Sequence, residues 1–413
     1  MKRSEEEQLI AQCLTLIDQQ QTTLGECSGE LNPWRYLDQD RFDQEMQCLY
    51  QRLPMPCVHV SELPKVGSSK TLKTAMGELI VIRSKEQTVR VFKNICLHRG
   101  ARLLPVGSDC QNKLTCPYHG WVYELNGQLK GVPSQASCFP DLNLQDKQLH
   151  QVYAVERFGL IWICPSATDQ SDAEQQLSRH LSHVDDMFHW MSLETLHVFK
   201  SKVKRWRCNW KILAEGGLET YHFAKAHQKT IAPFFTNNTS LHHSLGLHQR
   251  VIIPSKAYLS VKKQNPFKQK LRAFTHTLLA LMPQSSFLIQ EHHVDWIQAR
   301  PISVDETELT IVSLIPEDPS QLSDERRRHW QTNFSITLTT LDEDFEIGEG
   351  IQASMRAHPS MAINPGLSET ALLNFNHTVD DLCEHSLTNS LTQLKDDVAN
   401  VDHKERITCD SPE

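Results

Sequence analysis

The hydrophobic pattern of this chain changes period several times, and each change predicts a different kind of element. Between residues 4 and 20, apolar side chains recur every three or four positions, the spacing of an amphipathic helix. These positions are Leu9, Ile10, Cys13, Leu14 and Ile17. A second helix is expected over residues 39–53, which begin in an acidic turn and end before Pro54. We therefore predict an N-terminal helical segment over residues 1–55.

From residue 56 the pattern becomes alternating, which is typical of half-buried strands. Residues 58–60, 79–81 and 89–91 each place apolar side chains at every second position, and turn residues such as Gly77 lie between these runs. Short strands with frequent turns predict an antiparallel β domain over residues 56–165.

The second half of the chain mixes strand and helix patterns. A polar, acidic connector over residues 166–186 is expected to be partly helical, a β segment follows over 193–203, and Ser323 starts a long helix. Further strands are expected at 250–253, 257–261, 286–290, 296–302 and 309–314. These elements predict an α+β domain over residues 166–385. A polar tail with few apolar anchors follows over residues 386–413.

Composition and charge narrow the class of protein. The 413 residues are enough for about two or three domains, and the 12 cysteines are too scattered for a disulfide scaffold. Lys plus Arg number 42 and Asp plus Glu number 50, which gives a net charge of −8. An acidic chain is not expected to bind nucleic acid through its overall field. The first residues lead into no long apolar run, so we expect no signal peptide, no membrane span and a cytoplasmic location.

Two short motifs combine cysteine and histidine at close spacing. Cys96 and His98 form Cys-x-His, and Cys116 and His119 form Cys-x-x-His. Two thiolates and two imidazoles suit zinc, or a [2Fe–2S] cluster with Cys on one iron and His on the other. A zinc finger usually pairs Cys with Cys and His with His, whereas each motif here supplies one of each. The mixed arrangement favours the cluster over a zinc knuckle or over free buried side chains.

A second candidate metal site lies in the helix-like stretch over residues 209–227. Glu219 and His222 are three residues apart and share a helical face, but His222 and His227 are five apart. On an ideal helix that spacing turns them about 140° away from each other. The helix must therefore bulge or end between them if both bind one metal. Two His and a carboxylate can hold mononuclear Fe(II); the alternative is an ordinary Glu–His helix pair with a His near a helix end.

Residues 94–101, 116–123 and 125–133 resemble the Rieske domain of Rieske-type non-heme iron oxygenases, and the resemblance covers about residues 34–385. It implies an oxygenase alpha subunit with a helix-grip (START/Bet v 1-like) catalytic domain after the Rieske domain. It also implies a [2Fe–2S] cluster and a mononuclear Fe(II). The implied cluster ligands are Cys96, His98, Cys116 and His119.

The same resemblance assigns roles around the second site. His222 and His227 match the two histidine ligands of the catalytic iron, and Asp344 is preferred to Asp342 as the third ligand. Glu219 matches the bridging acid, which in this family links His98 or His119 of one subunit to the iron of its neighbour.

The residues next to that acid bear on the branch of the family. Glu at position 219 is typical of the branch that acts on quaternary ammonium compounds. Gly216, Gly217 and Thr220 depart from that branch, which has Asn, Phe and Cys at these positions. Because each Gly costs a helix about 1 kcal/mol relative to Ala, the pair suggests a close backbone approach or a kink.

The resemblance implies a homotrimer that uses O₂ and electrons from an NAD(P)H-dependent reductase or ferredoxin. Its substrate would be a small organic compound that is hydroxylated or demethylated. The competing interpretations are a Rieske-type electron carrier and a zinc-stabilised binding protein. An aromatic acid would call for Lys225 or Arg300 near the pocket, and a quaternary ammonium for an aromatic cage. The aromatic candidates are Phe234, Phe235, Tyr258, Phe287 and Trp296.

Overall fold

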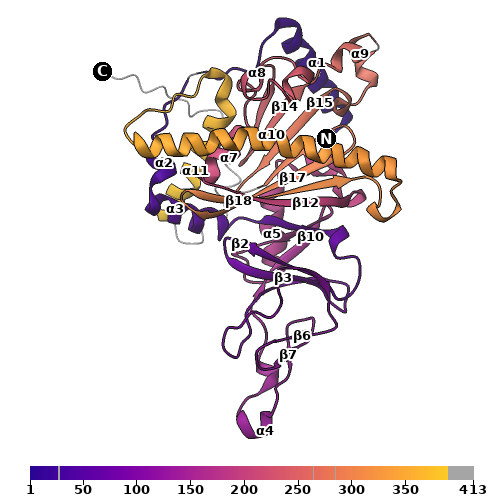
Figure 1. Ribbon diagram of the computed structural model, residues 1–413, viewed down its shortest axis with the longest axis vertical. Coiled ribbons are helices and arrows are strands. Elements are labelled where there is room, and N and C mark those ends of the chain that lie inside the picture. The colour runs from indigo at the N-terminus through magenta and orange to yellow at the C-terminus, as the bar shows by residue number, and fades with distance from the viewer. Residues whose placement is uncertain (27, 264, 284, 389–413) are drawn as a thin grey trace. The chain divides into compact units, whose positions relative to one another are not determined.

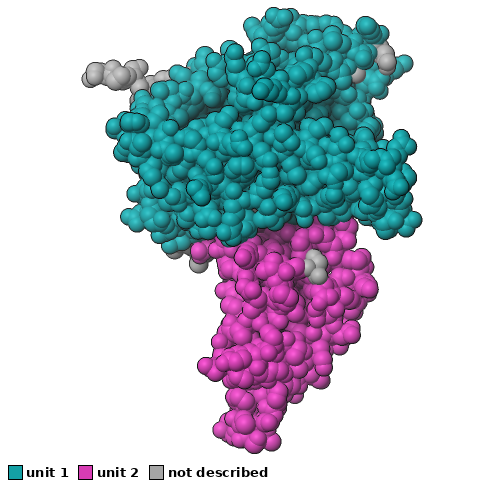
Figure 2. All heavy atoms as spheres, viewed as in Figure 1, with its two compact units in different colours: residues 1–49, 181–191, 196–413 teal, residues 50–180, 192–195 magenta. Residues whose placement is uncertain are grey.

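The computed structural model describes residues 1–26, 28–263, 265–283 and 285–388, and the predicted tail lies almost entirely outside them. The chain divides into two compact units, which Figure 2 shows in different colours. The smaller unit comprises Tyr50–His180 and Ser192–Thr195. The larger unit comprises Met1–Leu49, Leu181–Met191 and the chain from Leu196. The helices expected as a separate N-terminal segment thus belong, up to residue 49, to the larger unit.

The smaller unit is built from antiparallel strands, as the alternating pattern predicted. Its three sheets have the orders β1-β11-β10, β5-β2-β3-β4-β9 and β6-β7-β8. The strands are β1 (Met55–His59), β2 (Ser68–Thr74), β3 (Gly77–Arg83), β4 (Val89–Lys93), β5 (Gly107–Cys110), β6 (Leu114–Thr115), β7 (Val122–Tyr123), β8 (Leu129–Gly131), β9 (Gln151–Val152), β10 (Ala154–Arg157) and β11 (Leu160–Ile163). One short helix, α4 (Gln135–Cys138), follows β8. The connector then forms α5 (Gln170–Leu181), so the expectation of partial helix there is confirmed.

The larger unit contains a seven-stranded antiparallel sheet crossed by one long helix (Figure 1). The strand order is β12-β18-β17-β16-β15-β14-β13. The strands are β12 (His197–Trp206), β13 (Leu241–Leu245), β14 (His248–Pro254), β15 (Thr275–Leu281), β16 (Ser285–Ile289), β17 (Val294–Ser303) and β18 (Glu306–Ile315). The long helix is α10 (Asp324–Ala357), and the Ser323 side chain caps it by accepting from the Arg326 N–H. This is the α+β arrangement that the resemblance implied.

The remaining helices of the larger unit surround the sheet. They are α1 (Arg3–Gln19), α2 (Trp34–Leu37), α3 (Gln39–Glu45), α6 (Asp185–Met191), α7 (Trp210–Gly216), α8 (Phe223–Ala226), α9 (Tyr258–Lys262) and α11 (Thr370–Thr388). The helix predicted over residues 39–53 is α3 continued by a π-helical turn over Met46–Tyr50. No helix in the described part of the chain is long and apolar enough to cross a bilayer.

The core of the larger unit lies between the sheet and α10. Leu309 and Ile311 of β18 pack with Phe334 and Phe345 of α10, and with Leu213 of α7. Burial of such side chains stabilises the fold by roughly 1.5–3 kcal/mol each. The long helix is therefore fixed in rotation as well as position, which decides the side chains it presents to the sheet.

In the larger unit one predicted strand is wrong and two strands were missed. The run at 257–261 falls in α9, because β14 is already paired on both sides by β13 and β15 and offers no edge. A short apolar run fits a helix as readily as a strand. β13 and β15 gave no clear alternation, and only their pairing with β14 defines them.

Candidate metal centres

The two Cys–His loops of the smaller unit have the same backbone design. In the first loop the Cys96 N–H donates to the Ala101 carbonyl (2.8 Å) and the Gly100 N–H donates to the Cys96 carbonyl (3.0 Å). The second loop repeats both bonds at the same spacing around Cys116, with Gly120 in the place of Gly100. These glycines have φ of +75° and +70°, a region that other residues rarely adopt. Two equivalent turns therefore present their side chains to one point.

The side chains fit a binuclear cluster. Cys96 and Cys116 are only 1% and 3% exposed and their thiols interact, whereas His98 is half-buried and His119 is exposed. The imidazole centroids lie 4.6 Å apart, so both rings stand together at the rim. His98 Nδ1 is buried without a hydrogen-bond partner among the described residues, as expected of a donor atom kept for a metal. Two sulfurs inside and two imidazoles outside match a [2Fe–2S] cluster with Cys on one iron and His on the other.

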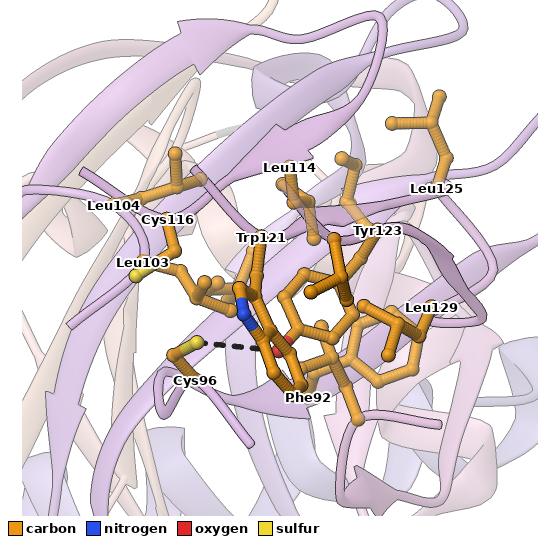
Figure 3. Packing of buried hydrophobic residues seen from close by; sticks show 14 residues of the cluster. Phe92, Cys96, Leu103, Leu104, Leu114, Cys116, Trp121, Tyr123, Leu125 and Leu129 are labelled. Atoms are coloured by element: carbon orange, nitrogen blue, oxygen red, sulfur yellow. Dashed lines mark hydrogen bonds between the residues drawn. The ribbon is translucent and has the colours of Figure 1, made fainter. Parts of the chain in front are cut away.

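Buried neighbours hold these ligands in place. The His98 ring stacks on Trp121 at 4.9 Å, with 5° between the planes. Tyr123 Oη accepts a bond from the Leu97 N–H (3.0 Å) and lies 3.2 Å from Cys96 Sγ. Figure 3 shows Cys96, Trp121 and Tyr123 converging within the hydrophobic cluster of this unit. Because the Tyr oxygen already accepts from Leu97, its own proton is available for the Cys96 sulfur.

The larger unit brings together His222, His227 and Asp344. Each of these three side chains offers one ligand atom, and the three atoms all lie within 4.8 Å of one another, close enough to hold a single metal ion. The two Nε2 atoms lie 3.2 Å apart, and Asp344 Oδ1 lies 2.9 Å from His227 Nε2 and 3.4 Å from His222 Nε2. Two imidazoles and one carboxylate facing a common point are the donor set of mononuclear Fe(II) sites.

The helix predicted through residues 209–227 is broken twice, once between the two histidines as expected and once before them. α7 ends at Gly216, and His222 and His227 flank the single turn α8 as its N-cap and C-cap. His227 leaves the helical region (φ −102°, ψ 23°), which allows two side chains five residues apart to converge. The break before His222 was not predicted, whereas the end of α8 at Ala226 lies between the histidines, as one of the predicted alternatives required. A Cβ on Gly217 would lie 2.9 Å from Leu278, so this glycine makes the predicted close approach.

Each histidine is held from behind by a carboxylate. Glu219 contacts His222 Nδ1 and accepts from the His222 backbone N–H (3.2 Å). Glu343 Oε2 lies 2.8 Å from His227 Nδ1 and accepts from Thr230 Oγ1 (2.6 Å). Carboxylates in this position fix the ring and raise its basicity as a ligand. Sequence reasoning missed Glu343, although its place beside Asp344 in an acidic run was a signal.

The three successive acids of α10, Asp342, Glu343 and Asp344, have different partners. Burial lowers the pKa of His227, but bonding to Asp344 and Glu343 outweighs it and the pKa is raised overall. Asp342 instead forms an ion pair with Lys204 of β12. Of the two candidates for the third ligand, the structure thus places Asp344 at the site and Asp342 away from it.

The aromatic residues considered for a substrate cage are not brought together. Phe287 and Trp296 stack at 5.9 Å and are both almost fully buried, and Phe234 is 67% exposed. Tyr258 packs with the cluster that includes α1. Only Phe235 lies near the metal site, through a ring contact with Phe223 at 5.7 Å.

The basic residues considered for an aromatic acid are also placed elsewhere. Arg300 forms an ion pair with Glu308 (2.8 Å), and Lys225 is exposed.

Comparison with known families agrees with this geometry. Residues 54–153 match the Rieske [2Fe-2S] domain, and residues 193–385 match the ring hydroxylating alpha subunit catalytic domain. The chain belongs to the Rieske non-heme iron oxygenases. In this Rieske oxygenase the first match contains Cys96, His98, Cys116 and His119. The second contains Glu219, His222, His227 and Asp344.

Curated relatives of this Rieske oxygenase fall in two groups. The alpha subunit of biphenyl 2,3-dioxygenase from Rhodococcus jostii is 31% identical over 194 residues, which is 46% of this chain and 42% of the relative. The oxygenase subunit of carnitine monooxygenase from Escherichia coli is 27% identical over 208 residues, 49% of this chain and 54% of the relative. The aligned segments thus span about half the length of these relatives.

Solved structures show the same fold. The quaternary ammonium Rieske monooxygenase CntA has a TM-score of 0.73 at 18% identity, covering 86% of this chain and 95% of that one. Naphthalene 1,2-dioxygenase from Rhodococcus sp. has a TM-score of 0.69 at 17% identity, covering 92% and 98%. At these identities the likeness is one of fold.

Proposed function

We propose that this chain is the oxygenase component of a multicomponent Rieske system, which uses O₂ and reductase-supplied electrons to hydroxylate or demethylate a small organic substrate. One observation carries the proposal: a single chain holds both the Cys–His loops and the His222/His227/Asp344 group. An electron carrier would need only the loops. A zinc-stabilised binding protein would need neither the mixed ligand pairs nor the second site.

The residues of the two sites have distinct parts in this proposal. When bound, the cluster would supply single electrons and the mononuclear iron would activate O₂. Cys96 and Cys116 bind from the inside, whereas His98 and His119 bind at the rim. In the larger unit, Glu219 and Glu343 orient the rings of His222 and His227 from behind.

Glu219 has a second role in this proposal. It is 8% exposed and contacts His222, so it is placed to couple an electron donor to the iron site. We propose that the donor is the rim of a neighbouring subunit, with His98 and His119, in a homotrimer. An NAD(P)H-dependent reductase or a ferredoxin is the proposed electron source. The proposed substrates are aromatic compounds or quaternary ammonium compounds.

Metal analysis and oxygen consumption test the function together. The purified protein should contain two cluster irons and one further iron per chain, with the visible absorption of a Rieske centre. Reductase-coupled O₂ uptake is then measured against a panel of aromatic and trimethylammonium compounds, with product detected by mass spectrometry. A colourless zinc protein, or one with cluster iron alone, would contradict the proposal.

A further inference from the structure

One face of the seven-stranded sheet is covered by α7 and α10, and His276 lies on that face. Ala280, Ser286 and Ile297 are paired across β15, β16 and β17 and line an apolar cavity of about 40 Å³ beneath α7. Residues two apart on a strand point to the same face. Leu278 and then His276 therefore continue the same surface along β15.

A chain of ring contacts joins His276 to the metal site. The His276 centroid lies 4.8 Å from that of Phe235, and Phe235 lies 5.7 Å from Phe223. Phe223 in turn lies 5.0 Å from His222 and 5.3 Å from His227. His276 is thus separated from the two histidine ligands by two phenyl rings.

The His276 imidazole has no hydrogen-bond partner within the described ranges, although the residue is half-buried. Burial, with a smaller contribution from the neighbouring His293, lowers the pKa of this imidazole to about 4, and Asp295 opposes the shift only in part. The ring is therefore neutral near pH 7, with one nitrogen that donates and one that accepts.

The carboxylate that acts electrostatically on His276 is a buried one. Asp295 is 0% exposed, and its Oδ2 accepts from Thr337 Oγ1 (2.6 Å) and from Gln290 Nε2 (3.0 Å). Its Oδ1 has no hydrogen-bond partner among the described residues, but the side chain is fully buried, so Asp295 offers no accessible charge for an ammonium next to His276. A neutral imidazole between phenyl rings and aliphatic side chains selects for an apolar body with a single uncharged polar group.

We propose that His276 determines substrate specificity by hydrogen-bonding a neutral polar group, a hydroxyl or a ring N–H, on an aromatic substrate. The inference rests on the proposed oxygenase function and names the substrate class of that site. A hydrocarbon of the same shape would leave the imidazole unpaired, and a quaternary ammonium has neither an N–H nor a lone pair to offer. Matching or missing one such bond is worth roughly 3–10-fold in affinity.

Phenol and toluene test this directly, because they differ by a hydroxyl in place of a methyl. Their dissociation constants are measured anaerobically by calorimetric titration of the iron-loaded protein, with phenyltrimethylammonium as a third probe. Wild type should bind phenol about 3–10-fold more tightly than toluene, and the trimethylammonium compound no more tightly than toluene. His276→Leu should abolish the preference, and His276→Asn should retain part of it. The matched control is His243→Leu on β13, which should keep the full preference.

The outcomes separate this inference from the function on which it rests. Equal binding of phenol and toluene by wild type, no binding of either, or tightest binding of the trimethylammonium probe would overturn the role of His276. So would a preference that survives His276→Leu at unchanged iron content. A phenol preference that depends on His276, without reductase-coupled O₂ uptake on any substrate, would instead overturn the oxygenase proposal and leave the binding role standing.

Discussion

Glu343 Oε2 lies 2.8 Å from His227 Nδ1, on the side of the ring opposite Asp344. One helix therefore supplies two successive carboxylates to the same imidazole, one at each nitrogen. We expect Glu343→Gln to weaken binding of the mononuclear iron by roughly 10–100-fold, because the ring loses the carboxylate that fixes it. Chelator competition followed by iron analysis measures this. The visible spectrum of the cluster is the internal control, and iron retention equal to wild type would contradict the role.

Asp344 and Asp342 form a matched pair of variants on one helix. Asp344→Ala should remove the mononuclear iron and leave the cluster spectrum unchanged, since Asp344 Oδ1 faces both His Nε2 atoms. Asp342→Ala should keep the iron and cost at most about 1 kcal/mol, the usual size of a partly exposed ion pair such as that with Lys204. Loss of iron from the Asp342 variant, with retention in the Asp344 variant, would reverse the assignment.

Glu219→Gln tests whether Glu219 couples the electron-donating cluster to the mononuclear iron. The amide can still accept from the His222 backbone N–H but, as in Glu343→Gln, the ring loses the carboxylate behind it, so iron binding should weaken. At iron content matched to wild type, turnover should still fall by roughly 10–100-fold or more. The measurements are iron content, the rate of chemical reduction of the cluster, and product formed in a single turnover. Full turnover with reductase in this variant would show that electrons reach the mononuclear iron without the Glu219 carboxylate.

Tyr123→Phe addresses the cluster loops. The Tyr proton available to Cys96 Sγ stabilises negative charge on that sulfur, so its removal should lower the reduction potential of the cluster. A bond worth about 1 kcal/mol corresponds to roughly 40 mV for one electron. A redox titration followed by absorbance measures the shift. An unchanged or raised potential would mean that the hydroxyl serves only the Leu97 N–H.

Glu215 gives the stability of the larger unit a pH dependence. Burial raises its pKa to about 7, although Tyr36 and Asn376 both donate to its Oε1 (2.8 and 2.7 Å). An acid whose pKa is higher in the folded state than in the unfolded state binds more protons when folded. Its contribution to the free energy of unfolding therefore falls as pH rises from about 4.5 to about 7.

Glu215→Gln keeps the acceptor and removes the charge. Relative to this variant, wild type should lose on the order of 3 kcal/mol between pH 5 and pH 8. The free energy of unfolding of wild type and Glu215→Gln is measured with denaturant at several pH values. Tyr36→Phe, which removes one hydrogen bond to Glu215 but keeps the carboxylate, is measured alongside. A constant difference between wild type and Glu215→Gln across this range would contradict the raised pKa.

Much of the fold followed from local pattern. The helix at residues 4–20 and the strands at 79–81 and 89–91 need only periodicity and turn residues, and they were confirmed, whereas the run at 58–60 extends one residue past the end of β1. The strand predicted at 257–261 failed for a reason outside the segment, because the neighbouring β14 has no free edge. The close approach of Gly217 to Leu278, just after the end of α7, likewise involves a residue remote in sequence.

The cluster ligands were readable from sequence because all four lie within one short stretch, where two equivalent turns bring them together without help from the rest of the chain. The mononuclear site is different. Asp344 lies far along the chain from His227, and only the packing of α10 on the sheet brings them to 2.9 Å. Each residue along a helix turns the side chain by about 100°. The rotation of that helix therefore decided that Asp344 faces the histidines, Glu343 supports one of them, and Asp342 points to Lys204.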